Sequence, residues 1–200
     1  MKQIARILST VFHPLLIPLY GMLLVVFFSY MSFFPWNLKG FILGMVALFT
    51  LLIPMLSIWL LKVMKLIGDV SLNNRADRKL PYLISLISYL FCGILLYKIG
   101  VPLWLVGFIA GGIASLIIAA FITIWWKISA HMTAMAGLTG CALFLSQAFS
   151  MLPFWILIAL ILLTGLLGSS RILLNRHTFG QVLAGTANGF ICVYLTMLLL

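Results

Sequence analysis

Residues 168–185 read GSSRILLNRHTFGQVLAG and place a short polar segment between two long apolar runs. The runs, about 152–168 and 178–199, approach the length that a helix needs to cross a bilayer. The segment between them therefore marks the turn between two membrane spans, and a new helix is expected to begin beside His177. The segment contains Ser170, Arg171, His177 and Gln181. Their side chains are of the types that bind anions and transfer protons.

The composition of the whole chain is that of a polytopic membrane protein. Its 200 residues are 65% hydrophobic and 7% charged, outside the usual range of soluble domains. No polar stretch is long enough to fold separately, so we expect one all-α domain over 1–200, an integral membrane bundle of six to seven spans. The apolar segments have the approximate bounds 8–33, 40–63, 81–98, 101–125, 131–149, 152–168 and 178–199.

Prolines interrupt two of these segments. Pro14 and Pro18 are expected to bend the first segment or to mark its interfacial end, and Pro54 is expected to do the same in the second. His13, beside the first of these prolines, is interpreted as a histidine at the membrane interface.

Seven spans place most basic residues at one face of the membrane. Connections alternate in side, so the N-terminus, the long polar connection 64–80 and the turns 126–131 and 169–177 share a face. Its cations are Lys2, Arg6, Lys62, Lys65, Arg75, Arg78, Lys79, Lys127, Arg171 and Arg176. The opposite face holds only Lys39 and Lys98. The excess of positive charge predicts that the basic face is cytoplasmic.

The charge balance indicates an anionic partner. Twelve Lys and Arg residues stand against two acids, Asp69 and Asp77, and the formal net charge is +10. Nucleic acid is not expected, because the aromatic residues lie inside apolar spans rather than beside the basic residues. Since no acidic pair occurs at the polar turns, we expect no metal ion and no other cofactor, and the sequence disfavours a proton-coupled acidic relay.

The residue types on the basic face suit phosphoryl transfer from a lipid. Cations must neutralise the phosphate oxygens, a nucleophile must attack in line, and an acid must protonate the leaving oxygen. His131 and His177, both near predicted helix N-termini, are the candidate carriers of protons or phosphoryl groups. The candidate phosphate-binding residues are Arg171, Ser129, Lys127, Arg75, Arg78 and Lys79. The sequence thus predicts a lipid phosphate as substrate and the bilayer as its setting.

Three short segments carry a resemblance to a known family. In chain order they are residues 73–81, NNRADRKLP, residues 128–131, ISAH, and residues 170–181, SRILLNRHTFGQ. They resemble the signatures Lys-x6-Arg-Pro, Pro-Ser-Gly-His and Ser-Arg-x5-His-x3-Asp of the type 2 phosphatidic acid phosphatase superfamily. The first keeps only Pro81, the second keeps Ser and His, and the third differs at its last residue.

The resemblance implies a membrane phosphatase with its core over about 64–199 and a phosphohistidine intermediate, in a bacterial inner membrane. It makes His177 the nucleophile and His131 the acid for the leaving group. The phosphate-binding residues that it implies are Arg171, Arg78, Lys79 and Ser129. Candidate substrates are phosphatidate, phosphatidylglycerol phosphate, a polyprenyl pyrophosphate and a lipid A phosphate.

Gln181 stands where the family has Asp. One helical turn after His177, its amide oxygen is able to accept the imidazole N–H, but it brings no negative charge. Two functions therefore stay open: hydrolysis of a lipid phosphate or pyrophosphate, and a catalytically weakened relative that binds or translocates an anionic phospholipid or polyprenyl phosphate. A small-solute transporter is disfavoured because the polar groups gather at one face rather than at the midplane. A homo-oligomer also stays open.

Small residues follow both histidines at helical spacing. They include Ala134, Gly137 and Gly140 in one predicted span and Gly180, Ala184, Gly185 and Gly189 in the other. Small residues allow helix backbones to approach closely in a membrane. We therefore expect these two spans to pack together and to bring His131 and His177 to one site.

Overall fold

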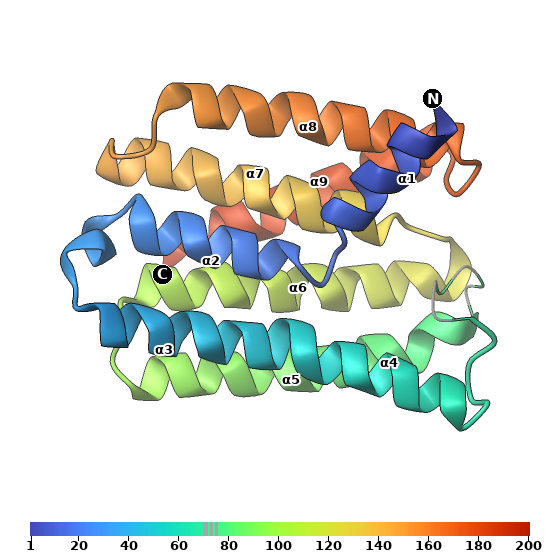
Figure 1. The fold of residues 1–200 in the computed structure, drawn as a ribbon, viewed down its shortest axis with the longest axis horizontal. Helices are drawn as coiled ribbons and strands as arrows, with labels where there is room; N and C mark the ends of the chain where they lie inside the picture. The colour runs from blue at the N-terminus through green and yellow to red at the C-terminus, as the bar shows by residue number, and fades with distance from the viewer. Residues whose placement is uncertain (70–71, 73, 75) are drawn as a thin grey trace.

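The computed structural model describes residues 1–69, 72, 74 and 76–200, and every regular element in this part of the chain is helical. The long helices run side by side as one bundle (Figure 1). The α-helices are α1 (Lys2–Val11), α2 (Ile17–Phe27), α3 (Trp36–Val46), α4 (Ile53–Val63), α5 (Lys79–Lys98), α6 (Leu103–Trp125), α7 (Ala130–Phe149), α8 (Phe154–Leu173) and α9 (Phe179–Leu199). The short elements are the 3-10 helices η1 (Tyr30–Phe33) and η3 (Ala76–Arg78) and the π-helical segment η2 (Ala47–Leu52).

Six helical stretches of the described chain are long and apolar enough to cross a membrane. They are Trp36–Val63, Ala76–Lys98, Leu103–Trp125, Ala130–Phe149, Phe154–Leu173 and Phe179–Leu199. Large apolar side chains such as Trp59, Phe91 and Leu162 are exposed on their outer faces, as contact with lipid requires. The predictions of an all-α bundle and of an integral multi-pass membrane protein are confirmed.

The first predicted segment, 8–33, is not one helix. Helices α1 and α2 are separated by residues 12–16, which include His13 and Pro14. Pro14 disfavours helical geometry in the residue before it, whereas Pro18 lies in the first turn of α2, where its missing N–H is not needed. With 11 residues, α2 is only about 16 Å long and too short to cross a bilayer alone.

Pro54 changes the helical geometry of the second span without ending it. The chain widens into η2, where the Ile53 N–H donates to the Leu48 carbonyl. The next carbonyl in this pattern, that of Phe49, would need the N–H that Pro54 lacks. The Ser88 hydroxyl of α5 donates to that carbonyl instead, which joins the second span to α5.

The connections alternate between two ends of the bundle (Figure 1). The N-terminus, the last turns of α4, α6 and α8 and the first turns of α5, α7 and α9 lie at one end, which we call the cationic end. Its described basic residues are Lys2, Arg6, Lys62, Lys65, Arg78, Lys79, Lys127, Arg171 and Arg176. Lys39 and Lys98 lie at the other end, so the predicted gathering of basic residues is confirmed. Arg75 lies outside the described residues.

Helices α7 and α9 approach more closely than side chains would allow. A Cβ on Gly189 would lie 1.8 Å from the Thr133 carbonyl oxygen, and one on Gly185 would lie 2.7 Å from the Ser129 carbonyl oxygen. The predicted contact between small residues is therefore confirmed. Because one histidine lies in the first turn of α7 and the other just before α9, this contact holds their two turns together.

Candidate functional site

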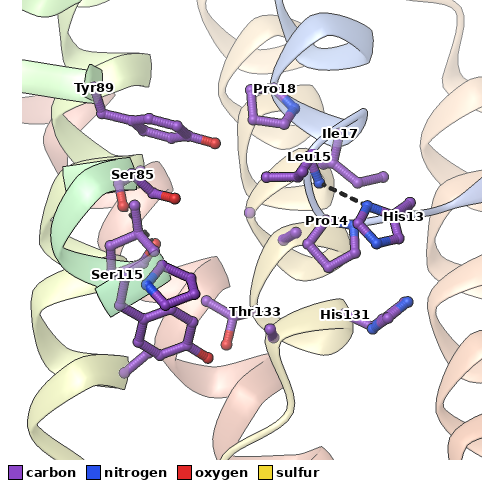
Figure 2. Close-up of a pocket in the computed structure, with 18 of the residues that line it drawn as sticks. His13, Pro14, Leu15, Ile17, Pro18, Ser85, Tyr89, Ser115, His131 and Thr133 are labelled. Atoms are coloured by element: carbon purple, nitrogen blue, oxygen red, sulfur yellow. Dashed lines mark hydrogen bonds between the residues drawn. The ribbon is translucent and has the colours of Figure 1, made fainter. Parts of the chain in front are cut away.

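A cavity of about 180 Å³ lies between the helices at the cationic end. Helices α5 and α6 form one wall, and α7 with the residues that join α1 to α2 forms the other (Figure 2). The basic side chains that line it are His13, Arg78, Lys127, His131, Arg171 and His177. Farther inside, the lining includes Phe108, Ile109, Leu138 and Val193. Both predicted catalytic histidines thus line one cavity, which has a cationic mouth and an apolar interior.

His177 is oriented by Gln181. Its Nδ1 lies 3.0 Å from Gln181 Oε1, and because an amide oxygen only accepts, Nδ1 carries the proton and Nε2 keeps its lone pair. The same oxygen accepts the Thr178 N–H at 3.3 Å, and the Gln181 N–H donates to the Thr178 hydroxyl at 3.4 Å. These bonds form a capping box. The predicted contact of the two side chains is confirmed, and the start of α9 fixes the imidazole ring.

The environment of His177 keeps its ring neutral. Burial lowers its pKa from 6.5 to about 4, the hydrogen bond to Gln181 partly opposes this, and the charges of Lys127, Arg78 and Arg171 lower it further. The side chain is 7% exposed. At pH 7 the ring is therefore in the form whose free nitrogen is nucleophilic.

His131 is held by helix α1. Its Nε2 lies 3.1 Å from the Ser9 carbonyl oxygen, across 122 positions of the chain. A carbonyl oxygen only accepts, so Nε2 carries the proton. Arg171, His13 and His177 all act on this ring electrostatically. The N-terminal helix is therefore part of the site, although nothing in the sequence connects it to His131.

His13 belongs to the cavity, whereas the sequence suggested only an interfacial position. Its ring is edge-on to that of His131, with centroids 5.7 Å apart, and the Leu15 N–H donates to its Nδ1 at 3.4 Å (Figure 2). Burial and then the charge of Arg171 lower its pKa. The available signal was a histidine beside Pro14 inside an apolar segment, since a polar group at such a break faces the protein rather than lipid.

The fold uses the guanidinium groups of Arg78 and Arg171 differently. Arg78 is 7% exposed and donates from Nε to the Leu72 carbonyl and from Nη1 to the Ile128 carbonyl, both at 2.9 Å. Arg171 Nε is buried and has no hydrogen-bond partner among the described residues. A buried donor without an acceptor is costly, so Arg171 is the stronger candidate for binding an oxygen of a ligand.

Positive charge in the cavity is not balanced by acids. Lys127 Nζ donates to the Arg176 carbonyl at 3.1 Å, and burial and then the charge of Arg78 lower its pKa. Among the residues that the structure describes, no Asp or Glu side chain lines the cavity. Asp77 instead accepts the backbone N–H of Gly68. An excess of cationic donors in a confined space is the arrangement that binds an anion.

Two predicted phosphate-binding residues, Lys79 and Ser129, do not line the described cavity. Lys79 is exposed, because it is rotated by about 100° from Arg78 around the helix axis. Ser129 is fully buried where α7 meets α9, and its hydroxyl has no partner in the described chain. Arg75 lies outside the described residues. The predicted phosphate contacts of these three residues stay predictions.

Comparisons of the chain with protein-family models, with curated proteins and with solved structures found no match. The resemblance to the phosphatase signatures therefore depends on the three segments themselves and stays a hypothesis. Among the described residues, no group of three or more His, Cys, Asp or Glu side chains is placed to hold a metal ion. The predicted independence of metal and cofactor likewise stays a prediction.

Proposed function

We propose that this protein is a membrane phosphatase that hydrolyses a lipid phosphate or pyrophosphate through a phosphohistidine intermediate. The observation that supports it most is the shared cavity, where His177 and His131 lie beside three cationic side chains and above an apolar interior. A lipid phosphate has the same two parts, with its phosphate at the mouth and its chain directed into the bilayer. Fixed cations around a reacting phosphate are a major source of transition-state stabilisation.

In the first step, the Nε2 lone pair of His177 attacks phosphorus. The P–O bond to the lipid breaks, and its electron pair leaves with the lipid oxygen. The phosphate binds as its monoanion, and its proton passes through Nδ1 of His131 to the leaving lipid oxygen, while the Nε2–H of this ring donates to the Ser9 carbonyl. Arg171 and Lys127 neutralise the phosphate oxygens during the transfer.

In the second step, a water molecule attacks phosphorus and gives a proton to Nδ1 of His131. The P–N bond breaks, its electron pair returns to Nε2 of His177, and inorganic phosphate leaves. Gln181 keeps the ring oriented throughout, but a neutral amide does not balance the positive charge of the phosphorylated imidazole. We therefore expect slower turnover than an aspartate or glutamate at this position would give.

A second candidate function is the binding or translocation of an anionic lipid without turnover. Two observations favour it: Gln181 brings no negative charge to His177, and His131 gives its Nε2–H to a backbone carbonyl. A binding protein would use the cationic mouth and the apolar interior but would need no proton transfer.

Phosphate release by the purified protein in vesicles separates the two candidates. Phosphatidate, phosphatidylglycerol phosphate, a polyprenyl diphosphate and a lipid A phosphate are supplied separately, with a metal chelator present. Hydrolysis predicts release from at least one lipid by the wild type and by Lys98→Ala, a change at the opposite end, and no release by His177→Ala. Equal release by wild type and His177→Ala contradicts the catalytic role. Lipid binding without release supports the second candidate.

A further inference from the structure

Helix α1 presents three different faces. The face that packs on the bundle has small or half-buried side chains, those of Ala5, Leu8 and Ser9. A second face exposes large apolar side chains, those of Ile4, Ile7 and Val11. A third face exposes two cations, Lys2 and Arg6. At about 100° per residue, the exposed apolar face and the cationic face lie roughly 150° apart around the helix axis. The helix is therefore amphipathic on the part of its surface that the protein leaves uncovered.

The three faces suit a helix at the surface of a bilayer. Helix α1 lies beside α8 and runs obliquely inward from the cationic end (Figure 1). With 10 residues it is too short to cross a bilayer. A helix with opposed apolar and basic faces binds where head groups meet hydrocarbon. Because α1 contains no acidic residue, charge complementarity favours anionic head groups over zwitterionic ones.

The contact of α1 with the rest of the protein is small. Only Ala5 and Ser9 of this helix are buried, and neither brings a large apolar side chain into the core. A helix of this length is marginal on its own, so its position depends on additional contacts. Each basic residue near an anionic membrane surface strengthens binding about fivefold. Lys2 and Arg6 together are therefore able to stabilise the docked position of α1 by up to about thirtyfold.

The position of α1 is coupled to the ring of His131. The carbonyl of Ser9, on the packed face, accepts the Nε2–H of His131 at 3.1 Å. His13, in the segment that follows α1, lies edge-on to the same ring, with centroids 5.7 Å apart (Figure 2). If α1 moved away from the bundle, the His131 ring would lose both contacts together. Whatever holds α1 in place therefore also fixes the orientation of His131.

We propose that α1 is a binding surface for the anionic phospholipid head groups of the leaflet at the cationic end, and that this binding keeps Ser9 and His13 against His131. The lipid acts here as part of the bilayer and is not the molecule that enters the cavity. The binding surface does not depend on the proposed hydrolysis, whereas its effect on turnover does. An anionic leaflet should therefore order α1 and, through His131, raise turnover.

Hydrogen exchange tests the binding surface without reference to catalysis. The full chain is placed in nanodiscs of phosphatidylcholine alone or mixed with phosphatidylserine, whose phosphate is a diester. The amides of α1 should exchange about five- to thirtyfold more slowly in the anionic nanodiscs. The double variant Lys2→Gln, Arg6→Gln should lose this difference. The matched control, Lys62→Gln with Lys65→Gln, removes the same charge at the same end of the bundle and should keep it.

Two results overturn the binding surface. One is equal exchange of α1 in the two kinds of nanodisc, or the same difference in both double variants. The other is equal slowing by inorganic phosphate in phosphatidylcholine nanodiscs that the change of Lys2 and Arg6 abolishes, because the ligand is then a free anion rather than a membrane surface.

Phosphate release from the best substrate tests the coupling to His131. Release should rise when phosphatidylserine is added to the wild type and to the Lys62 and Lys65 control, and it should not rise in Lys2→Gln, Arg6→Gln. If exchange responds to phosphatidylserine but release does not, the coupling to His131 is wrong. If exchange responds and no lipid is hydrolysed, the binding surface is supported and the proposed function is wrong.

Discussion

The two ends of the bundle treat their buried polar groups in opposite ways. At the end away from the cations, the buried Ser29 hydroxyl donates to the Val25 carbonyl at 2.6 Å. The half-buried Trp104 side chain donates from Nε1 to the Tyr30 hydroxyl at 3.0 Å. At the cationic end, two buried polar groups have no partner within the part of the chain that the structure describes: the Ser129 hydroxyl and Arg171 Nε.

The end away from the cations is closed by aromatic side chains, and we call it the aromatic end. The rings of Tyr30, Trp104, Phe144 and Phe149 lie in mutual contact, with centroids 4.9 to 6.2 Å apart. Edge-on and tilted aromatic pairs of this kind stabilise a fold. This end therefore contributes stability, and the polar groups named above are satisfied within the chain.

The difference suggests which residues act on a ligand. The unpaired atoms of Ser129 and Arg171 belong to the residue that precedes α7 and to α8, and both of these helices also extend to the aromatic end. Unpaired donors, uncompensated cations and a cavity occur together only where the two histidine turns are, among the described residues. Substitutions at the cationic end should therefore change function, and those at the aromatic end should change stability.

Arg171→Gln is expected to have the largest effect. It removes a positive charge while keeping a polar side chain, and the loss of one fixed donor to a transition state typically lowers the rate by about 10²–10³. Phosphate release per folded protein measures the effect. Lys98→Gln, the same kind of change at the aromatic end, should leave release unchanged, and equal losses in both variants would contradict the contrast between the ends.

Gln181→Glu is expected to raise activity by about tenfold or more. The glutamate keeps the length that reaches both His177 and the Thr178 N–H, and it adds a negative charge beside the phosphorylated ring and the start of α9. The measurement is kcat/KM for the best substrate. Gln147→Glu at the aromatic end should have no such effect. No gain from Gln181→Glu, together with lipid binding, would favour the second candidate function.

The pH profile provides a third test. His177 attacks only when neutral, and its pKa is lowered to about 4, so kcat/KM should rise with pH through about 4 and be level above 6.5 with respect to this group. If the His177 ring were exposed to water, the rise of kcat/KM with pH would instead be centred near 6.5. Gln181→Glu should move it upward, because a nearby carboxylate stabilises the charged ring. A wild-type limb near 6.5 would show that the ring is solvated.

Trp104→Phe is expected to have the smallest effect. It removes the hydrogen bond to Tyr30 but keeps an aromatic ring, so the free energy of unfolding should fall by about 1 kcal/mol. Thermal or denaturant unfolding in detergent measures this, and phosphate release per folded protein should not change. A large loss of activity at unchanged stability would mean that the aromatic end takes part in function.

Sequence reasoning succeeded where the determining contacts are local. His177 and Gln181 lie four residues apart where a helix begins, so the contact between their side chains was predictable. The basic residues were predicted to lie at one end because successive spans of bilayer length bring alternate connections to the same side. The approach of α7 and α9 followed from their small residues.

The rest depends on packing between distant segments. The Ser9 carbonyl reaches His131 only because α1 lies against the bundle after the break at Pro14, and no local pattern encodes that contact. Tyr82, Ser85 and Tyr89 follow Arg78 at helical spacing in the sequence, but only the cavity shows that this side of α5 faces the protein.

The most direct test of the central claim is to trap the phosphorylated protein. Wild type and His177→Ala are mixed with a lipid phosphate, quenched in alkali, digested and examined by mass spectrometry. The account predicts an acid-labile phosphoryl group on His177 in the wild type and none in the variant. Phosphate release by the wild type without phosphorylation of His177, or with phosphorylation of another residue, would contradict it.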